Sequence, residues 1–461
     1  MQLGVKIIHR LFLSYHIVME FFHDFVQLHS IAFSAGILIA AYFFIAAEKI
    51  PKVTVALLGA VITIILGLLS QDKGANGSLD PDYFINFIDF NVIFLLVAMM
   101  IIVNIAARSG MFNWTANELL KFTKGHPKRV LFTLGIFTAV ASAFLDNVTT
   151  VILVMPVTFV IAKELDIDPV PLLITEIFAS NIGGTSTLIG DPPNIIIGSA
   201  AGLSFLDFLL ELTGIIVLIL LVSMIFLMFI FRKKLKTSPE RMLRVTKIDN
   251  SGTITDYPLM LRCAIVLGLV ILGFILHDVI HIQSCIVAMA GASFLLVFEK
   301  PQHEILHNVE WNTIFFFIGL FIIIGGLEAS GGIALMAKWL LNITQGSQSA
   351  TAMVILWASG ILSGIVDNIP YTVTMSPMLV QIQSVMGAEY THPLWWCLSL
   401  GACLGGNMTI IGAAANVIVS ETASASGHPI SFMKFMKYGI LITFVSLTLS
   451  SFYIYFRFLV S

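Results

Sequence analysis

The sequence predicts an all-α polytopic membrane protein of two inverted repeats. Each repeat has five transmembrane helices and one re-entrant hairpin, with broken helices at the membrane midplane. Of its 461 residues, 58% are hydrophobic and 11% are charged, and the mean hydropathy is +0.96, whereas soluble domains average about 25% charged residues. In addition, apolar stretches recur along the chain and a pair of polar motifs occurs twice, as is typical of secondary transporters.

The repeated motifs are an Asp-Asn pair and, further on, a Gly-Gly pair followed by another glycine and an asparagine. The matched positions are Asp146 and Asn147 with Asp367 and Asn368, Pro156 with Pro377, Gly183 and Gly184 with Gly405 and Gly406, Gly190 with Gly412, and Asn194 with Asn416.

Taken in order, the chain begins with residues 1–29, which we expect to form an amphipathic segment on the membrane surface. The longest uncharged run there, Leu11–Met19, is shorter than the roughly 20 apolar residues that a span requires. An additional span is the alternative. The remaining predicted parts are the first repeat (30–231), a basic linker (232–257) and the second repeat (258–461).

The first repeat contains clear apolar spans, an amphipathic interfacial helix, two short arms that meet at the first Asp-Asn pair, and a helix broken by glycine and proline. These are, in order, Ile31–Ala47, Val53–Ser70, Asn91–Ala107, Phe112–Phe122, Val130–Phe144 with Val148–Ile161, the broken Leu172–Ala201, and Ile215–Phe231. The second repeat has the same order: Leu259–Leu276, Ile282–Phe298, Asn312–Leu327, Ile333–Leu341, a hairpin with Asp367 near its tip, a broken span through Gly405, and Tyr438–Phe456.

An odd number of spans in each repeat makes the second copy enter from the opposite side, so the repeats are inverted. The positive-inside rule sets the orientation. With the basic linker in the cytoplasm, 19 Lys and Arg residues fall inside and 3 outside. We therefore expect a multi-pass protein of the cell (inner) membrane with a cytoplasmic linker.

Two hairpin tips and two broken helices should form a polar site in the bilayer. A charge there costs about 2.5–3.5 kcal/mol on insertion scales, so Asp146 and Asp367 indicate ion or proton binding. We expect Na+ at these aspartates with Asn147 and Asn368, completed by broken-helix carbonyls. The other expected ion- or substrate-binding residues are Thr149, Gly183, Gly184, Thr185, Thr187, Asp191, Asn194, Gly405, Gly406, Asn407, Thr409 and Asn416.

Several of these residues have a structural alternative. Glycine pairs often serve close helix packing. Asp191, followed by Pro192, fits a helix cap better than an ion ligand, since the second repeat has Ala413 there. Glu176, within an apolar run, is either a proton site or part of a buried salt bridge. Cys403 is expected to serve packing, although a thiol would suit arsenite.

Other classes of function are disfavoured. A net charge of -3 and no basic face argue against a nucleic-acid partner. Four cysteines without paired spacing disfavour a disulfide framework or zinc site. No phosphate-binding loop occurs, so we expect no cofactor, with Na+ or H+ as coupling ions. An intramembrane aspartyl protease would need glycine where this chain has Leu188.

These motifs resemble the ion transporter superfamily of arsenite permeases, NhaD-type Na+/H+ antiporters and divalent-anion/Na+ symporters, and most closely the melanosomal P protein and its prokaryotic relatives. The segments that carry the resemblance are Phe144–Thr150, Asn181–Asn194, Asp367–Thr372 and Gly401–Val417. The resemblance implies an elevator-type movement and a homodimer. In the dicarboxylate symporters, Ser-Asn-Thr occupies both tips; aspartate there disfavours a dianionic substrate.

The sequence therefore predicts a secondary transporter in the lipid bilayer that exchanges Na+, or a similar cation, for H+. Proton-coupled efflux of arsenite or antimonite is one alternative. A Na+-coupled anion or dicarboxylate transporter, or an anion channel, is another. In each case the partner is a small ion or small molecule.

Overall fold

The computed structural model describes residues 24–47, 49–69, 84–246 and 252–460. The predicted surface segment 1–29 thus lies almost entirely outside the described residues. The described chain is helical, without strands. It divides into two compact units: the described residues up to Asp89 with Trp311–Trp339, and the described residues from Phe90 to Glu310 with those from Leu340 onward. Each unit contains parts of both sequence halves, so the compact units do not follow the repeats.

The first unit packs three apolar helices, α2 (Ser30–Ala46), α3 (Lys52–Ile65) and α16 (Trp311–Ala329), beside the short η1 (Ile85–Phe87). They match predicted spans, except that α3 ends five residues before Ser70. The chain turns instead at Gly67, whose φ of 65° suits glycine. Glycine also lets α16 approach α3, because a Cβ at Gly319 would lie 2.7 Å from the Ala56 carbonyl carbon.

The second unit holds the remaining helices. Its first part comprises α4 (Phe90–Arg108), α5 (Met111–Phe122), α6 (Pro127–Phe144), α7 (Asn147–Leu165), α8 (Val170–Gly184), α9 (Pro192–Ala201), α10 (Phe205–Phe231), α11 (Pro239–Thr246), α12 (Tyr257–Ile275), α13 (His277–Ile280), α14 (Ser284–Phe298) and α15 (Gln302–His307). Its second part comprises α18 (Gln348–Ser363), α19 (Asn368–Met386), α20 (Ala388–Gly405), α21 (Ala414–Ala425), α22 (Phe432–Ile454) and η2 (Tyr455–Leu459). Helix α17 (Gly332–Ile343) crosses the boundary between the units.

Both predicted helix breaks are confirmed. Helix α8 ends at Gly184 and α9 begins at Pro192, while α20 ends at Gly405 and α21 begins at Ala414. A proline at the first position of α9 is tolerated because the N–H there has no helical partner. The two segments predicted to be interfacial helices are helical, as α5 and α17; their location at the interface stays a prediction.

Several helices are longer than predicted. The hairpin arms α6 and α7 have 18 and 19 residues, and each is long and apolar enough to cross a membrane, so the prediction of short arms is wrong. Hydropathy marks only the apolar run, whereas the helices continue into charged residues at their outer ends. For the same reason α10 begins ten residues before Ile215, at a capping box formed by Ser204 and Asp207. Helix α22 begins six residues before Tyr438.

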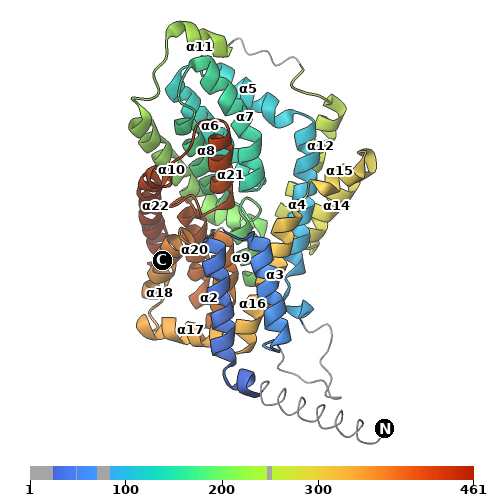
Figure 1. The fold of residues 1–461 in the computed structure, drawn as a ribbon, viewed down its shortest axis with the longest axis vertical. Coiled ribbons are helices and arrows are strands. Elements are labelled where there is room, and N and C mark those ends of the chain that lie inside the picture. The colour runs from blue at the N-terminus through green and yellow to red at the C-terminus, as the bar shows by residue number, and fades with distance from the viewer. Residues whose placement is uncertain (1–23, 48, 70–83, 247–251, 461) are drawn as a thin grey trace, which may run out of the picture. The chain divides into compact units, whose positions relative to one another are not determined.

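The two halves pair their helices in the same way. Helix α8 packs against α6 and α7, as α20 packs against α18 and α19. The second part of each broken helix crosses to the other half, so that α9 packs on α19, and α21 packs on α7. In Figure 1, α21 (dark red) accordingly lies among α6, α7 and α8, and α9 lies beside α20. The pairing supports a duplicated architecture; the inversion of the repeats stays a prediction.

The basic linker is more ordered than expected, since it contains α11 and is attached to the turn between α7 and α8. Lys234 Nζ lies 2.8 Å from Asp168 Oδ2, and Arg241 pairs with Asp166. Partial burial works to raise the pKa of Asp168, but the hydrogen bond from Lys234, the Val170 N–H and the Lys234 charge together lower it. These contacts bind the linker to the outer end of the first hairpin.

Candidate functional site

The structure brings nearly all of the predicted site residues into the second compact unit, at the hairpin tips and helix breaks. Asn147, Asp191, Asp367 and Asn368 are buried, and Asp146 is half-buried. The threonines, glycines and asparagines of both breaks are buried as well. The site is therefore a polar cluster inside an apolar helical body.

Two asparagines hold the breaks in shape. Asn194 Nδ2 donates to the carbonyl oxygens of Thr185 and Thr187, at 3.1 and 2.8 Å. Asn416 Nδ2 donates to those of Gly406 and Thr409, at 2.7 and 2.9 Å. These carbonyls already accept hydrogen bonds, so the two asparagines position the broken segments.

One threonine in each half attaches the helix break to its hairpin. Thr187 Oγ1 donates to the carbonyl of Ala143 and accepts from the Gly190 N–H at 3.2 Å. Thr409 Oγ1 donates to Gly364 O at 2.6 Å and accepts from the Gly412 N–H at 3.1 Å. The same contacts occur in both halves, so the polar frame is duplicated.

The glycine pairs allow close approach of backbones. A Cβ at Gly183 would lie 2.1 Å from Ala139 O, and one at Gly405 would lie 2.5 Å from Gly360 O. The second glycine of each pair lies close to the glycine at the other end of the same helix break. A Cβ at Gly184 would lie 2.6 Å from the carbonyl oxygen of Gly190. Packing is thus one role of these glycines, as the structural alternative predicts.

The aspartates at the hairpin tips both stand before a helix but differ in backbone. Asp146 has an extended backbone, with φ of −72°, and its carboxylate accepts from the N–H of Thr149 at 2.8 Å and from the Thr149 hydroxyl. Asp367 has φ of 71°, in the left-handed region, and accepts from the Ile369 N–H at 3.2 Å. The second tip is therefore strained where the first is relaxed.

The prediction that Asp191 caps α9 is wrong. It stands at the N-cap position, but its side chain makes no cap hydrogen bond. The carboxylate instead accepts from Asn368 Nδ2, at 3.3 and 3.2 Å. Asp367, which precedes Asn368 in the chain, is buried at the same hairpin tip. A residue of the first break thus joins the tip of the second hairpin.

Buried amides form a second connection between the halves. Asn181 Nδ2 donates to Asn407 Oδ1 and Asn416 Oδ1, both at 2.9 Å. In turn, Asn194 Oδ1 accepts from Ser399 Oγ at 2.6 Å and Cys403 Sγ at 3.5 Å. Cys403 is the counterpart of Asn181, two residues before the Gly-Gly pair, so equivalent positions reach across to opposite halves.

Sequence reasoning missed several residues of this cluster. Ser142 Oγ donates to Asn147 Oδ1 at 2.5 Å, and Ser180 Oγ donates to the Asn147 carbonyl at 3.2 Å. Asn181 and Ser399 were missed as well. Cys403 belongs to the cluster, although packing was its favoured role in the sequence analysis. Their position inside or beside the repeated motifs was a signal available in the sequence.

Glu176 lies away from this cluster, on α8 and facing α7. Its Oε1 accepts from the Thr158 hydroxyl. In the part of the chain that the structure describes, Oε2 is buried without a hydrogen-bond partner. A hydroxyl, and not the cation of a salt bridge, is therefore its partner.

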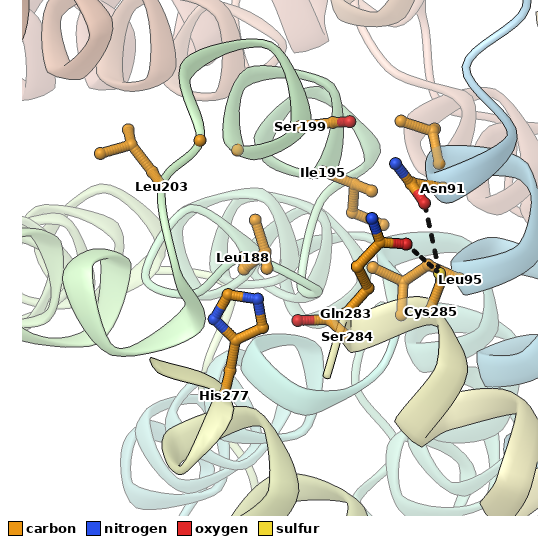
Figure 2. Close-up of a pocket in the computed structure, with 13 residues that line it drawn as sticks. Asn91, Leu95, Leu188, Ile195, Ser199, Leu203, His277, Gln283, Ser284 and Cys285 are labelled. Atoms are coloured by element: carbon orange, nitrogen blue, oxygen red, sulfur yellow. Dashed lines mark hydrogen bonds between the residues drawn. The ribbon is translucent and has the colours of Figure 1, made fainter. Parts of the chain in front are cut away.

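A separate cavity of about 200 Å³ lies where α4, α9 and the start of α14 meet. Figure 2 shows that its wall combines apolar side chains, such as Leu188 and Ile195, with the polar His277 and Gln283. The Cys285 thiol donates to Asn91 Oδ1 at 3.4 Å in this wall. None of the predicted site residues lines the cavity.

The oxygens of Asp191, Asp367, Asn368 and Asn147 could hold a Na+ ion, since hard cations prefer oxygen ligands. In the described residues, no three His, Cys, Asp or Glu side chains cluster as metal ligands. Seven described helices are long and apolar enough to cross a membrane, and shorter apolar helices accompany them. Together with paired broken helices around buried carboxylates, this defines a multi-pass membrane transporter.

The comparisons identify the family. The family described as citrate transporter (CitMHS) matches residues 42–401, so the chain belongs to this family, within the ion transporter superfamily, and is a transporter and not an enzyme. It is 42% identical to the "uncharacterized transporter Rv2684" of Mycobacterium tuberculosis, over 92% of this chain and 98% of that protein. It is 31% identical to the mouse P protein, over 92% of this chain and 60% of the P protein.

The fold has a counterpart among solved structures. The YdaH transporter of Alcanivorax borkumensis aligns with a TM-score of 0.55, covering 87% of this chain and 95% of that chain. At 15% sequence identity the likeness concerns the fold alone. It agrees with the predicted polytopic transporter architecture.

Proposed function

We propose that this transporter exchanges Na+, or a similar cation, for H+. One observation carries the proposal: the buried Asp191 carboxylate of the first half contacts Asn368 at the tip of the second hairpin, directly after the buried Asp367 in the chain. Two neighbouring carboxylates cannot both stay ionised in a buried site unless a cation or a proton compensates them. Alternate occupancy by cation and proton would meet this requirement.

The proposed cation position is Asp191 and Asp367 with the amide oxygens of Asn147 and Asn368. When the cation leaves, a proton on one carboxylate would replace the charge of the cation and leave a hydrogen-bonded pair of one carboxylic acid and one carboxylate. Asp146 occupies the equivalent tip of the first half, so we propose it with Asn147 as a second position. Its bonds to Thr149 would then have to loosen when a cation binds.

We further propose an elevator-type movement, a homodimer, and a cytoplasmic location for residues 232–257 in the cell (inner) membrane. The family resemblance supports the first two, and the distribution of Lys and Arg supports the third.

The test uses purified protein in liposomes with a trapped pH dye and an imposed proton gradient. Addition of Na+ or Li+ should dissipate the gradient, and K+ should serve as the comparison cation. Asp367→Asn should abolish the response, and Asp146→Asn should abolish or weaken it, with both variants folded as judged by gel filtration. Full activity in both variants, or silence of the wild-type protein to all cations, would overturn the proposal.

Two observations favour other substrates, which the same liposome assay can test. The Cys403 thiol contacts the site through Asn194, which favours a thiol-binding substrate such as arsenite as the second candidate. Ala413 stands where the first half has Asp191, so the N-terminus of α21 lacks a carboxylate and could face an anion. Arsenite and citrate should therefore be added in parallel with the cations; a response to one of them alone would replace the cation.

A further inference from the structure

Glu176 on α8 and Thr158 on α7 form a polar pair between these two helices. Both side chains are fully buried. The Thr158 hydroxyl contacts Oε1, and, among the described residues, Oε2 has no hydrogen-bond partner. A buried carboxylate with one satisfied oxygen is strongly disfavoured as an ion.

Among the residues that the structure describes, no other charge compensates this carboxyl. Helix α8 packs against α6, α7, α10, α20 and α21. Of the groups that the structure describes on these helices, only the Thr158 hydroxyl acts on Glu176, besides its burial. A buried carboxyl of this kind favours its neutral, protonated form over the ionised one.

The second half shows what the fold itself requires at these positions. Alignment of the Gly-Gly pairs places Leu398 opposite Glu176, and alignment of Pro156 with Pro377 places Leu379 opposite Thr158. Both leucines are fully buried, and they lie on α20 and α19, which pack together as α8 and α7 do. Two apolar side chains thus serve the same architecture, so the acid and its hydroxyl are not needed for packing.

The pair lies between the central site and the linker end of the hairpin. At about 1.5 Å per residue, Glu176 is roughly 12 Å along α8 from Gly184 and roughly 9 Å from Val170. Beyond Val170 lies the turn that Lys234 and Arg241 bind. In the other direction, Ser180 is one helical turn from Glu176 and contacts Asn147, a neighbour of Asp191.

We propose that Glu176 is a second proton-binding residue, separate from the Asp191 and Asp367 site, which passes protons between that site and the linker end of the hairpin. Its carboxylic acid releases a proton toward the linker end when water reaches it, and the carboxylate takes one from the central site when a cation enters there. Thr158 donates its hydroxyl hydrogen bond to the carboxylate in the ionised state. This inference rests on the proposed proton coupling.

Two variants and one control test it. Glu176→Gln keeps the shape and removes the titratable group. The double variant Glu176→Leu with Thr158→Leu installs the pair that the second half already packs, so folding is expected to survive. Glu164→Gln, which changes a carboxyl at the far end of α7, is the control and should behave as wild type.

The first measurement is an infrared titration of the purified protein, which follows protonated carboxyl groups and does not require transport. The wild-type protein should show one protonated carboxyl band that both Glu176 variants lack and the control keeps. No such difference at any pH would overturn the proposal.

The second measurement is cation-driven proton flux in liposomes. Both Glu176 variants should lower the flux by about 10²-fold, the low end of the contribution of one proton-transfer group, with the pH profile of residual flux altered and Na+ binding retained. Wild-type flux with a wild-type pH profile would overturn the proposal. If the wild-type protein moves no protons, the proposed function fails, and the infrared titration alone decides whether Glu176 binds a proton.

Discussion

The two halves of this transporter share their framework and differ in their acids. In both halves an asparagine and a threonine hold the helix break by the same hydrogen bonds, and a glycine brings the broken helix onto its hairpin. The carboxyl groups are not all repeated: the positions that correspond to Asp191 and Glu176 in the second half are Ala413 and Leu398. The comparison teaches that the two halves share the hydrogen-bonded frame of their helix breaks, whereas two of the buried acids occur in the first half without an acidic counterpart in the second.

Removal of the Asp191 carboxylate should have the largest effect on transport. Asp191→Asn is expected to lower cation-driven proton flux by at least about 10²-fold, because one of two interacting carboxylates is lost. Flux in liposomes measures it. Asp256→Asn is the control, since Asp256 caps α12 outside the site and asparagine is an equally good cap. If Asp191→Asn transports normally, the asymmetry between the halves has no functional meaning.

A Cβ at the first glycine of each pair should destabilise both halves alike. Gly183→Ala and Gly405→Ala would each meet a backbone carbonyl oxygen, at 2.1 and 2.5 Å. Overpacking of this kind costs about 1–3 kcal/mol, measured as a lower unfolding temperature in detergent. Gly214→Ala, where a Cβ meets nothing within 4 Å, is the control. A large effect in one half only would contradict the duplicated framework.

The hairpin tips should respond in opposite directions. Asp367→Gly relieves a positive φ and should raise stability by about 1 kcal/mol, although it removes a proposed ligand. Asp146→Ala removes a cap bond to Thr149 and should lower stability by about 1 kcal/mol. The same thermal unfolding assay compares them. Equal losses at both tips would mean that Asp367 is not strained.

The smallest expected effect on stability is at the contact between Lys234 of the linker and Asp168 of the first half. The pKa of Asp168 is lowered in the folded protein, so its stabilisation is present above the ordinary value of 3.8 and is lost as pH falls through the lower folded value. The pair is partly exposed, so we expect less than about 1 kcal/mol. Lys234→Ala should remove this acid dependence; an unchanged pH profile of the unfolding temperature would show that the contact adds nothing.

Much of the fold could be predicted from the sequence because its signals are local. Apolar runs mark helices, Gly184 and Pro192 mark the ends of one break, and the repeated Asp-Asn pair marks both hairpin tips. Helix ends were less predictable where charged residues extend an apolar helix, as at Pro127 and Phe205. Hydropathy carries no information about such extensions.

The sequence by itself therefore determined the membrane class, the order of helices, the breaks and the set of polar residues that could form a site. Only the tertiary structure decided how these polar residues pair. Asp191 could satisfy its carboxylate at its own helix N-terminus, yet its partner is Asn368, 177 residues away. Asn181 likewise reaches Asn416, 235 residues away. A local cap and a distant amide satisfy a buried oxygen equally well, and the packing of the two halves decides which of them is within reach.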